Sequence, residues 1–258
     1  MEALRLDNIS KSFGRLQVLQ NVSFSVEHGK HKVILIGPNG AGKTTLFNLI
    51  SGELAPSEGK IYLFSRDVTR MSCHQRVHLG LGRTYQIANL FFNLTVLDNV
   101  LMALNRHKAS PFHMFQSMTA YREFFTEAET LLNRIDNLWE KRAFPLSQLS
   151  YGEIRQMELI LGLAVRPKLL LLDEPTAGLT SSEAEALSGL IRKLPDDITV
   201  LMIEHDMKVA FDLADSMIVL HQGEILASGS PAEIKANAQV KGVYFGGTQY
   251  HGRHPSAR

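Results

Sequence analysis

The stretch GPNGAGKTT, residues 37–45, decides the fold of this chain. It matches the pattern G-x-x-x-x-G-K-[ST] and lies between an apolar run at residues 33–36 and a helical run at residues 46–51. Glycines allow successive backbone N–H groups to turn toward one anion, and the helix that follows adds the positive end of its dipole. A strand, a glycine-rich loop and a helix in this order predict a phosphate-binding loop.

Every residue of this loop is a candidate nucleotide ligand. Lys43 supplies a mobile positive charge for the outer phosphates, and the hydroxyl of Thr44 is a candidate Mg²⁺ ligand. The bare pattern arises by chance about once in a hundred chains of this size, and the flanking strand and helix make a chance match rarer. The candidates are Gly37, Pro38, Asn39, Gly40, Ala41, Gly42, Lys43, Thr44 and Thr45.

Composition and charge narrow the class of protein. The 258 residues are 45% hydrophobic and 21% charged, which is typical of a soluble globular protein that forms one domain or a core with an inserted lobe. The net charge of +1 gives no support to a nucleic-acid-binding surface. Cys73 is the only cysteine, which suits a reducing compartment. We expect no signal peptide and no membrane-spanning helix, so any role at a membrane would act through a partner.

The periodicity of apolar residues predicts an α/β fold. The expected strands occupy residues 3–9, 22–26, 33–36, 60–63, 169–174, 199–203, 216–220 and 224–228. The expected helices occupy residues 46–51, 97–104, 121–135, 182–194 and 208–214. Apolar runs that alternate with helices imply a mostly parallel sheet covered on both faces. We therefore expect an α/β core into which a helical lobe, about residues 88–165, is inserted.

Polar residues follow several of these strands. Gln86, Asp173, Glu174 and His205 each fall at the end of a predicted strand, and ligands gather at the carboxyl edge of a parallel sheet. Asp173 is placed to hold Mg²⁺ through water, and Glu174 to orient or deprotonate a water for in-line attack. Taken singly, Gln86 also fits a surface polar residue and His205 a loop histidine. Their convergence favours a site that hydrolyses a nucleotide.

A second anion site is predicted at LSYGE, residues 149–153. Ser150 and Glu153 have the spacing of a capping box, and a plain helix cap is the alternative. Gly152, just inside the helix, is costly for a mere cap and indicates that another group approaches the backbone there. Because this turn belongs to the helical lobe, it does not easily reach the phosphate loop of its own chain. We infer that it contacts a second subunit.

Six motifs follow one another along the chain: GPNGAGKTT, Gln86, LSYGE, LLLLDEP, the AGL turn at residues 177–179 and His205. On these motifs the chain resembles an ATP-binding cassette (ABC) subunit from end to end. The resemblance implies a P-loop NTPase (RecA-like) core at residues 1–87 and 166–250, with an N-terminal antiparallel β subdomain. It also implies an inserted α-helical signature subdomain at residues 88–165. The tail at residues 251–258 is expected to be disordered.

The same resemblance implies a head-to-tail dimer with two ATP molecules between the subunits. Each ATP would lie between the phosphate loop of one subunit and the signature turn of the other, Ser150, Tyr151, Gly152 and Glu153. Phe13 would stack on adenine, although it also fits an aromatic residue that covers a strand end. The implied catalytic residues are Glu174, His205 and Gln86, and the implied Mg²⁺ ligands are Thr44, Gln86 and Asp173.

A narrower likeness lies in GLGRTYQIANLFFNLTVLDNV, in the LSYG form of the signature, in IEHDM, and in the tail sequence GSPAEIKANAQVKGVYFG. These segments look like the larger-type ATPase subunit of branched-chain amino acid importers. Thr180 stands where that family usually has Asp or Asn, and Glu153 where Gln is common. Neither departure removes a group that the chemistry needs.

This likeness implies particular partners and a location. They are a second ABC ATPase subunit, two membrane permease subunits and, indirectly, an extracytoplasmic solute-binding protein, at the cytoplasmic face of the bacterial inner membrane. Residues 87–93, with Leu90, Phe91 and Phe92, form a candidate docking groove, or else pack between core and lobe. The alternatives are an ABC system for urea or amide uptake, one for lipid or lipopolysaccharide export, an ABC ATPase that acts on nucleic acid or ribosomes, and a nucleotide-binding regulator.

Overall fold

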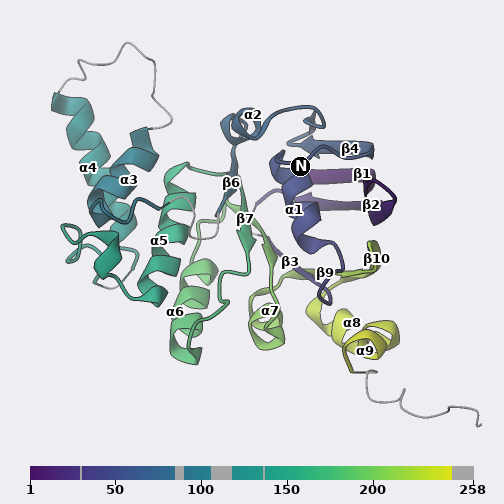
Figure 1. The fold of residues 1–258 in the computed structure, drawn as a ribbon. Coiled ribbons are helices and arrows are strands. Elements are labelled where there is room, and N and C mark those ends of the chain that lie inside the picture. Colours follow the sequence, from purple (N-terminus) through teal and green to yellow (C-terminus); the bar gives the residue numbers. More distant parts are fainter. Residues whose placement is uncertain (30, 85–89, 106–117, 136, 246–258) are drawn as a thin grey trace, which may run out of the picture.

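The computed structural model describes residues 1–29, 31–84, 90–105, 118–135 and 137–245. The predictions made for Gln86, for residues 87–89 and for the tail at residues 251–258 lie outside this part of the chain. The described strands form two sheets, with helices packed between and around them (Figure 1).

The larger sheet carries the phosphate loop. Its strands are β3 (Lys32–Ile36), β6 (Leu81–Arg83), β7 (Leu169–Asp173), β8 (Thr199–Ile203), β9 (Ser216–His221) and β10 (Glu224–Gly229). They lie in the order β10-β9-β3-β8-β7-β6, and all the pairings from β9 to β6 are parallel. Only β10 is antiparallel to its neighbour β9. The mostly parallel sheet expected from the sequence is therefore confirmed, and the carboxyl ends of β3, β8, β7 and β6 share one edge.

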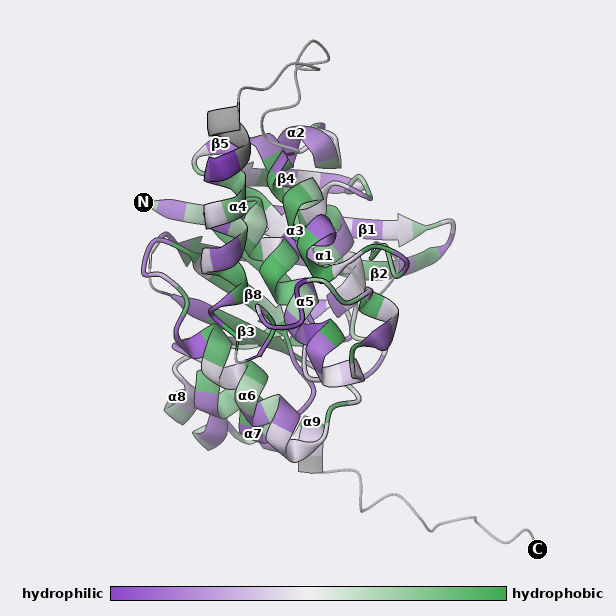
Figure 2. Ribbon diagram, turned by 90° about the vertical axis from the view of Figure 1, so that its left-hand side faces the viewer, coloured by the Kyte–Doolittle hydropathy of each residue, from purple (hydrophilic) through white to green (hydrophobic). Residues whose placement is uncertain are grey.

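The second sheet is antiparallel and contains the N-terminal strands. It consists of β1 (Glu2–Phe13), β2 (Leu16–Glu27), β4 (Glu58–Leu63) and β5 (Arg66–Asp67), in the order β2-β1-β4-β5. Helix α1 (Lys43–Ser51) packs between the two sheets, because Leu46 and Phe47 join one buried cluster with Leu4 of β1 and Leu35 of β3. The hydropathy view shows green, apolar segments between the layers (Figure 2).

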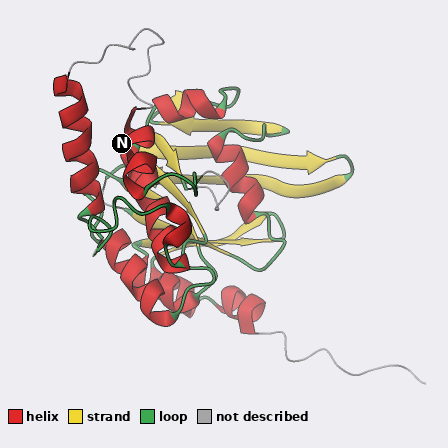
Figure 3. Ribbon diagram, turned by 60° about the vertical axis from the view of Figure 1, so that its left-hand side comes forward, coloured by secondary structure: helices red, strands yellow, loops and turns green. Residues whose placement is uncertain are grey.

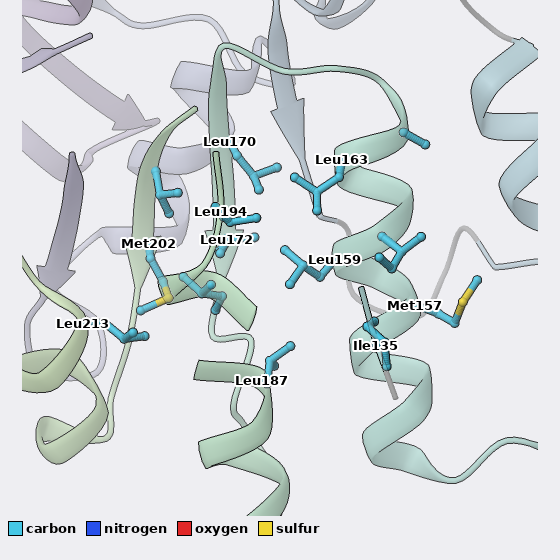
Figure 4. Packing of buried hydrophobic residues seen from close by; sticks show 14 of the residues in the cluster. Ile135, Met157, Leu159, Leu163, Leu170, Leu172, Leu187, Leu194, Met202 and Leu213 are labelled. Carbon is cyan, nitrogen blue, oxygen red and sulfur yellow. The ribbon is translucent and has the colours of Figure 1, made fainter. Parts of the chain in front are cut away.

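The opposite face of the larger sheet is covered by helices. Successive residues of β3 point to opposite faces, so that Leu35 packs with the first cluster while Ile34 and Ile36 pack with a second one. This second cluster contains residues of α3 (Val96–Asn105), α4 (Met118–Leu132), α5 (Tyr151–Ala164), α6 (Ser181–Arg192) and α7 (Met207–Leu213). Helices lie beside the strands of this sheet (Figure 3). Leu170 and Leu172 of β7 meet Leu159 and Leu163 of α5 in the second cluster (Figure 4).

Most predicted elements are confirmed, with small shifts at their ends. Helix α1 begins at Lys43 rather than at Leu46, and β1 continues to Phe13. The apolar face predicted for residues 121–135 is buried at Phe124, Ala128, Leu131, Leu132 and Ile135. No described helix has the length and apolar character needed to cross a membrane.

Several short elements were not predicted, among them α2 (Cys73–His78), β5, α8 (Pro231–Ala236) and α9 (Ala238–Phe245). Helix α2 begins with a capping box formed by Ser72 and Gln75. Its Arg76 is 1% exposed and donates hydrogen bonds to the carbonyl oxygens of Leu49 and Ile50, at the end of α1. A buried arginine interrupts the apolar pattern by which a helix is recognised, which explains why α2 was missed.

Candidate active site

The phosphate loop turns sharply between β3 and α1. Gly40 and Gly42 have φ angles of 79° and 102°, a left-handed conformation that glycine adopts without steric cost. Gly37 is buried, and a Cβ atom placed on it would lie 2.2 Å from the carbonyl oxygen of Leu220 in β9. The glycines are therefore required by the path of the loop, while Asn39 is exposed.

Lys43 is held within the loop although it carries a charge. Its side chain is 6% exposed, and Nζ donates hydrogen bonds to the carbonyl oxygens of Gly37 at 2.7 Å and Pro38 at 3.0 Å. Burial lowers the pKa of the Lys43 ammonium, and the negative charges of Glu174 and Asp173 oppose that shift. Both carboxylates thus act on the loop lysine, as expected for groups at one edge of the sheet.

Asp173 and Glu174 follow the buried residues of β7. Burial raises the pKa of Asp173, while the positive charge of Arg83 opposes this shift. Glu174 adopts a left-handed backbone conformation with φ of 48°, and its N–H donates to the carbonyl oxygen of Ile203 at 3.0 Å. This hydrogen bond ties the end of β7 to the end of β8.

His205 contacts the Glu174 side chain directly. Its Nε2 atom lies 2.6 Å from Oε1 of Glu174, and the two side chains are 39% and 28% exposed. A hollow of about 260 Å³ lies beside this pair and is lined also by Gly178 and Asp206. The structure therefore joins a carboxylate and an imidazole that are 31 residues apart in the sequence.

Glu204 supports this pair and was not predicted as a site residue. It is 3% exposed and accepts hydrogen bonds from Thr176 Oγ1 at 2.8 Å, from the N–H of His205 at 2.9 Å and from the N–H of Asp206 at 3.1 Å. A carboxylate directly after a buried strand, as at Glu174, is the signal that would have identified it. Glu204 fixes the turn that carries His205.

The donor set at this edge suits Mg²⁺. Asp173 offers carboxylate oxygens, and Thr44 offers an exposed hydroxyl at the start of α1. Mg²⁺ prefers such hard oxygen ligands and keeps part of its water shell, so few protein ligands are needed. The residues present therefore fit this ion.

Phe13 is the last residue of β1. Its ring is 47% exposed, and Lys11 Nζ lies 5.0 Å from the ring centroid. Such a ring offers an open face on which a planar group could stack.

The start of α5 contains the predicted capping box. Ser150 Oγ accepts a hydrogen bond from the N–H of Glu153, and Glu153 Oε2 accepts one from the N–H of Ser150 at 2.9 Å. The group that approaches Gly152 is the carboxylate of Glu183 in α6, since a Cβ atom on Gly152 would lie 2.5 Å from Glu183 Oε1. Hydrogen bonds from Thr180, and a further one from the Gly152 N–H, lower the pKa of Glu183.

Tyr151 links the same turn to the segment that follows Glu174. Its hydroxyl donates to the carbonyl oxygen of Ala177 at 3.3 Å and accepts from Arg155 Nη2 at 2.7 Å. The ring also lies against Gly178 and is 39% exposed. Within this chain the signature turn therefore contacts residues after β7.

A glycine-rich loop between a parallel strand and a helix, with acidic residues at the end of a neighbouring strand, defines a P-loop nucleoside triphosphatase. A family model described as "ABC transporter" matches residues 19–177. The chain belongs to the ABC transporter family and is an ABC ATPase.

Relatives of known name match nearly the whole chain. The high-affinity branched-chain amino acid transport ATP-binding protein BraF of Pseudomonas aeruginosa is 36% identical over 250 residues, which cover 94% of this chain and 97% of BraF. The lipopolysaccharide export system ATP-binding protein LptB of Acidithiobacillus ferridurans is 35% identical over 246 residues, which cover 95% of this chain and 97% of LptB.

Solved structures agree with the fold. An ATP-binding cassette of an ABC transporter in its ADP conformation superposes with a TM-score of 0.83 and 30% identity, covering 95% of this chain and 99% of the other. A dimeric cassette in a post-hydrolysis state, bound to ADP and Pi, gives a TM-score of 0.73 and 26% identity, with 88% and 98% covered.

Proposed function

We propose that this chain is the ATP-hydrolysing subunit of a membrane importer for branched-chain or related amino acids. The observation that supports hydrolysis best is the meeting of Lys43, Asp173 and the Glu174–His205 pair at one sheet edge. The similarity to BraF supports the substrate class. In this proposal the chain is peripheral, at the cytoplasmic face of the bacterial inner membrane, and binds a second ABC ATPase subunit and two permeases. A solute-binding protein acts indirectly, and nucleic acid is not a ligand.

Each residue of the site has a separate role in the proposed hydrolysis. Backbone N–H groups of the loop bind the phosphates, and Lys43 turns from the loop carbonyls to the outer phosphates. Glu174 accepts a proton from the attacking water, while His205 holds Glu174 Oε1 and contacts the γ-phosphate. Thr44 and Asp173, together with Gln86, would hold Mg²⁺, which neutralises charge that develops on the phosphate oxygens.

A second subunit completes the site in this proposal. The Ser150 turn of the partner subunit would face the γ-phosphate, with Tyr151, Gly152 and Glu153 beside it. The exposure of Ser150 and Tyr151 and the dimeric form of a solved relative support this arrangement. Phe13 would stack on adenine through its exposed face.

The Glu174→Gln variant tests the proposed hydrolysis. Glutamine keeps the shape of the side chain but is a very weak base, so we expect ATP to bind normally while turnover falls by at least ~10²-fold. Binding is measured by calorimetry and turnover by phosphate release. Glu185→Gln, on the exposed surface of α6, is the matched control and should keep normal turnover. Near-normal hydrolysis by Glu174→Gln would contradict the role of general base.

A groove beside the site is the proposed permease contact. This groove, called the docking groove from here on, has a volume of about 750 Å³. It is lined by residues of α2, β6, α3 and α5 and of the segment before α3, among them Cys73, Arg83, Phe91, Met102, Glu158 and Leu161. Phe91 and Met102 are 52% and 47% exposed, whereas Phe92 packs against the buried cluster. An apolar patch of this kind suits an apolar segment at the cytoplasmic end of a permease.

Phe91→Glu tests the docking groove. A charge there should leave ATP binding by the isolated subunit intact while it lowers co-purification with the permeases and abolishes uptake, because the apolar contact is lost. Phe144→Glu is the matched control, since Phe144 is 46% exposed and lies outside the groove. Loss of ATP binding in Phe91→Glu would instead assign this region to internal packing.

Export is the second candidate function, because LptB is almost as similar to this chain as BraF is. Purification of the complex from its native membrane separates the two candidates. An importer should carry permeases that respond to a solute-binding protein, and uptake of a labelled branched-chain amino acid should depend on Glu174.

A further inference from the structure

Arg83 joins three parts of the fold through one buried guanidinium. It ends β6, and its side chain is 8% exposed. Nη1 donates to Ser51 Oγ at 2.8 Å and lies 3.0 Å from Glu53 Oε1, while Nη2 lies 3.4 Å from Asp173 Oδ2. In the sequence, Arg83 lies in the GLGRTYQ segment, a region without clear periodicity, and no role was predicted for it.

Two of these contacts lead to the nucleotide site. Asp173 is the carboxylate that fits Mg²⁺, and Ser51 is the last residue of α1, the helix that begins at Lys43. Both partners are shielded from water, since Ser51 is 1% exposed and the Asp173 side chain 10%. Arg83 therefore holds the Asp173 carboxylate and the far end of the phosphate-loop helix at the same time.

The guanidinium also faces the docking groove. Arg83 and Ser51 line this groove together with Phe91 and Met102. Within the described part of the chain, β6 is an edge strand of the larger sheet, so it has β7 as its one neighbour there. A partner segment bound in this groove would therefore contact Arg83, whose Nη2 atom lies 3.4 Å from Asp173 Oδ2.

Charge explains why an arginine suits this position. The Asp173 side chain is only 10% exposed, and the adjacent guanidinium of Arg83 compensates for the hydration that this buried carboxylate loses. The distance of 3.4 Å is longer than a full charge-assisted hydrogen bond of about 2.8 Å, so a small displacement strengthens or breaks the contact. The planar fork of arginine reaches Ser51 and Asp173 together, which the single ammonium of lysine does less well.

We propose that Arg83 is a positioning residue, which fixes the Asp173 carboxylate for Mg²⁺ and transmits occupation of the docking groove to that carboxylate. This proposal rests on the proposed function, because it assigns Mg²⁺ to Asp173 and a partner to the groove. Arg83 contacts Ser51, Glu53 and Asp173, and we assign it no direct role in the reaction. Its effect is exerted through Asp173.

The first test measures the Mg²⁺ dependence of nucleotide binding by the isolated subunit. Binding of a fluorescent ATP analogue is measured over a series of Mg²⁺ concentrations and in EDTA. All variants carry Glu174→Gln, which prevents turnover. Arg83→Met should raise the Mg²⁺ concentration for half-saturation about tenfold, which is the lower end of losses seen when a group that orients a metal ligand is removed. Arg83→Lys should give a smaller shift. Binding in EDTA should stay unchanged.

Glu53→Gln is the matched control, because Glu53 binds the same guanidinium from the exposed side. It should leave the Mg²⁺ dependence unchanged. An equal loss of binding with and without Mg²⁺ in Arg83→Met would show a merely structural role, and an unchanged Mg²⁺ requirement would likewise overturn the proposal. If Arg83→Met does not fold, Arg83→Lys decides between the same outcomes. Failure of the parent protein to bind ATP with Mg²⁺ would contradict the proposed function instead.

The second test asks whether the groove acts through Arg83. Cys73 is the only cysteine and lines the groove, so a bulky maleimide attached there occupies the groove without a permease. The label should shift the Mg²⁺ requirement of the parent protein at least about twofold, the smallest coupling expected between contacting groups, and should not shift that of Arg83→Met. Equal behaviour of the two labelled proteins would overturn transmission through Arg83.

Discussion

The carboxyl edge of the larger sheet and the N-terminal end of α5 differ in how their polar groups are held. At the sheet edge, the negative charges of Asp173 and Glu174 act on the pKa of Lys43, and Glu174 contacts His205. These groups come from separate strands and one helix. At the end of α5, the groups are held by a capping box and by Glu183 of the next helix.

This difference suggests separate roles for the two regions, with hydrolysis at the sheet edge and binding of the partner's nucleotide at the N-terminal end of α5. In the proposed function, the sheet edge would supply a base, a phosphate-binding lysine and metal ligands, whereas the N-terminal end of α5 would supply hydrogen-bond donors and a helix dipole. We infer from it that each chain carries two unlike halves of a composite site, and that each half needs the other half from a second subunit.

The largest effect is expected from Gly152→Asp. Its carboxylate would compete for the backbone donors of α5 and add a negative charge near the γ-phosphate of the partner's ATP. We expect normal ATP binding by the isolated subunit and a loss of ~10²-fold or more in turnover, the scale for removal of a donor that stabilises developing charge. Phosphate release and calorimetry measure the two quantities. Loss of binding in the monomer would contradict the division into halves.

Alanine in place of glycine should affect the two halves differently. In Gly37→Ala the new methyl group meets the backbone carbonyl of Leu220 at 2.2 Å, so we expect a loss of about 1–3 kcal/mol in the free energy of unfolding. In Gly152→Ala it meets the end of the flexible Glu183 side chain, and the higher helix propensity of alanine, worth roughly 1 kcal/mol, offsets the cost. Urea unfolding compares them. An equal loss of unfolding free energy in Gly37→Ala and Gly152→Ala would contradict the contrast between a fixed backbone neighbour at Gly37 and a flexible side-chain neighbour at Gly152.

The smallest expected effect is on the pH dependence of the free energy of unfolding, through Glu153 at the N-terminal end of α5. Burial would raise the pKa of Glu153, but hydrogen bonds from Lys141 and from the Ser150 N–H outweigh it and lower the pKa. A lowered pKa contributes stability above the ordinary value of 4.5, and this contribution is lost as the pH falls below that value. Lys141→Met should therefore cost less than ~1 kcal/mol at neutral pH, because the pair is partly exposed.

Urea unfolding at a series of pH values measures this cost. The difference between Lys141→Met and the parent protein should shrink as Glu153 becomes protonated. In a Glu153→Gln background, Lys141→Met should show no such pH dependence. A constant difference at all pH values would mean that Lys141 acts through packing alone.

The order of elements was predictable from the sequence because the central strands are continuous apolar runs. Leu169, Leu170, Leu171 and Leu172 are fully buried, so burial and pattern agree there. The phosphate loop was predictable for a related reason, since its glycines and lysine are adjacent in the chain. Contacts within a few residues leave a signature that a single sequence shows.

The supporting contacts were not predictable, because they join residues far apart in the chain. Arg83 and Asp173 are 90 residues apart, and Arg76 reaches a carbonyl 27 residues away. Both arginines are buried by partners that no local pattern reveals. The approach of Glu183 to Gly152 has the same origin, although the glycine itself indicated that some group lies there.

The central claim, a site shared between two subunits, is tested most directly by mixing two inactive variants. Lys43→Ala removes the phosphate-loop half and Gly152→Asp removes the α5 half, so each variant alone should lack ATP hydrolysis. In a mixed dimer, one site combines an intact phosphate loop with an intact α5 turn. Random pairing makes half of the dimers mixed, each with one intact site, so an equal mixture should recover about a quarter of the parent rate. A mixture as inactive as its components would contradict the shared site.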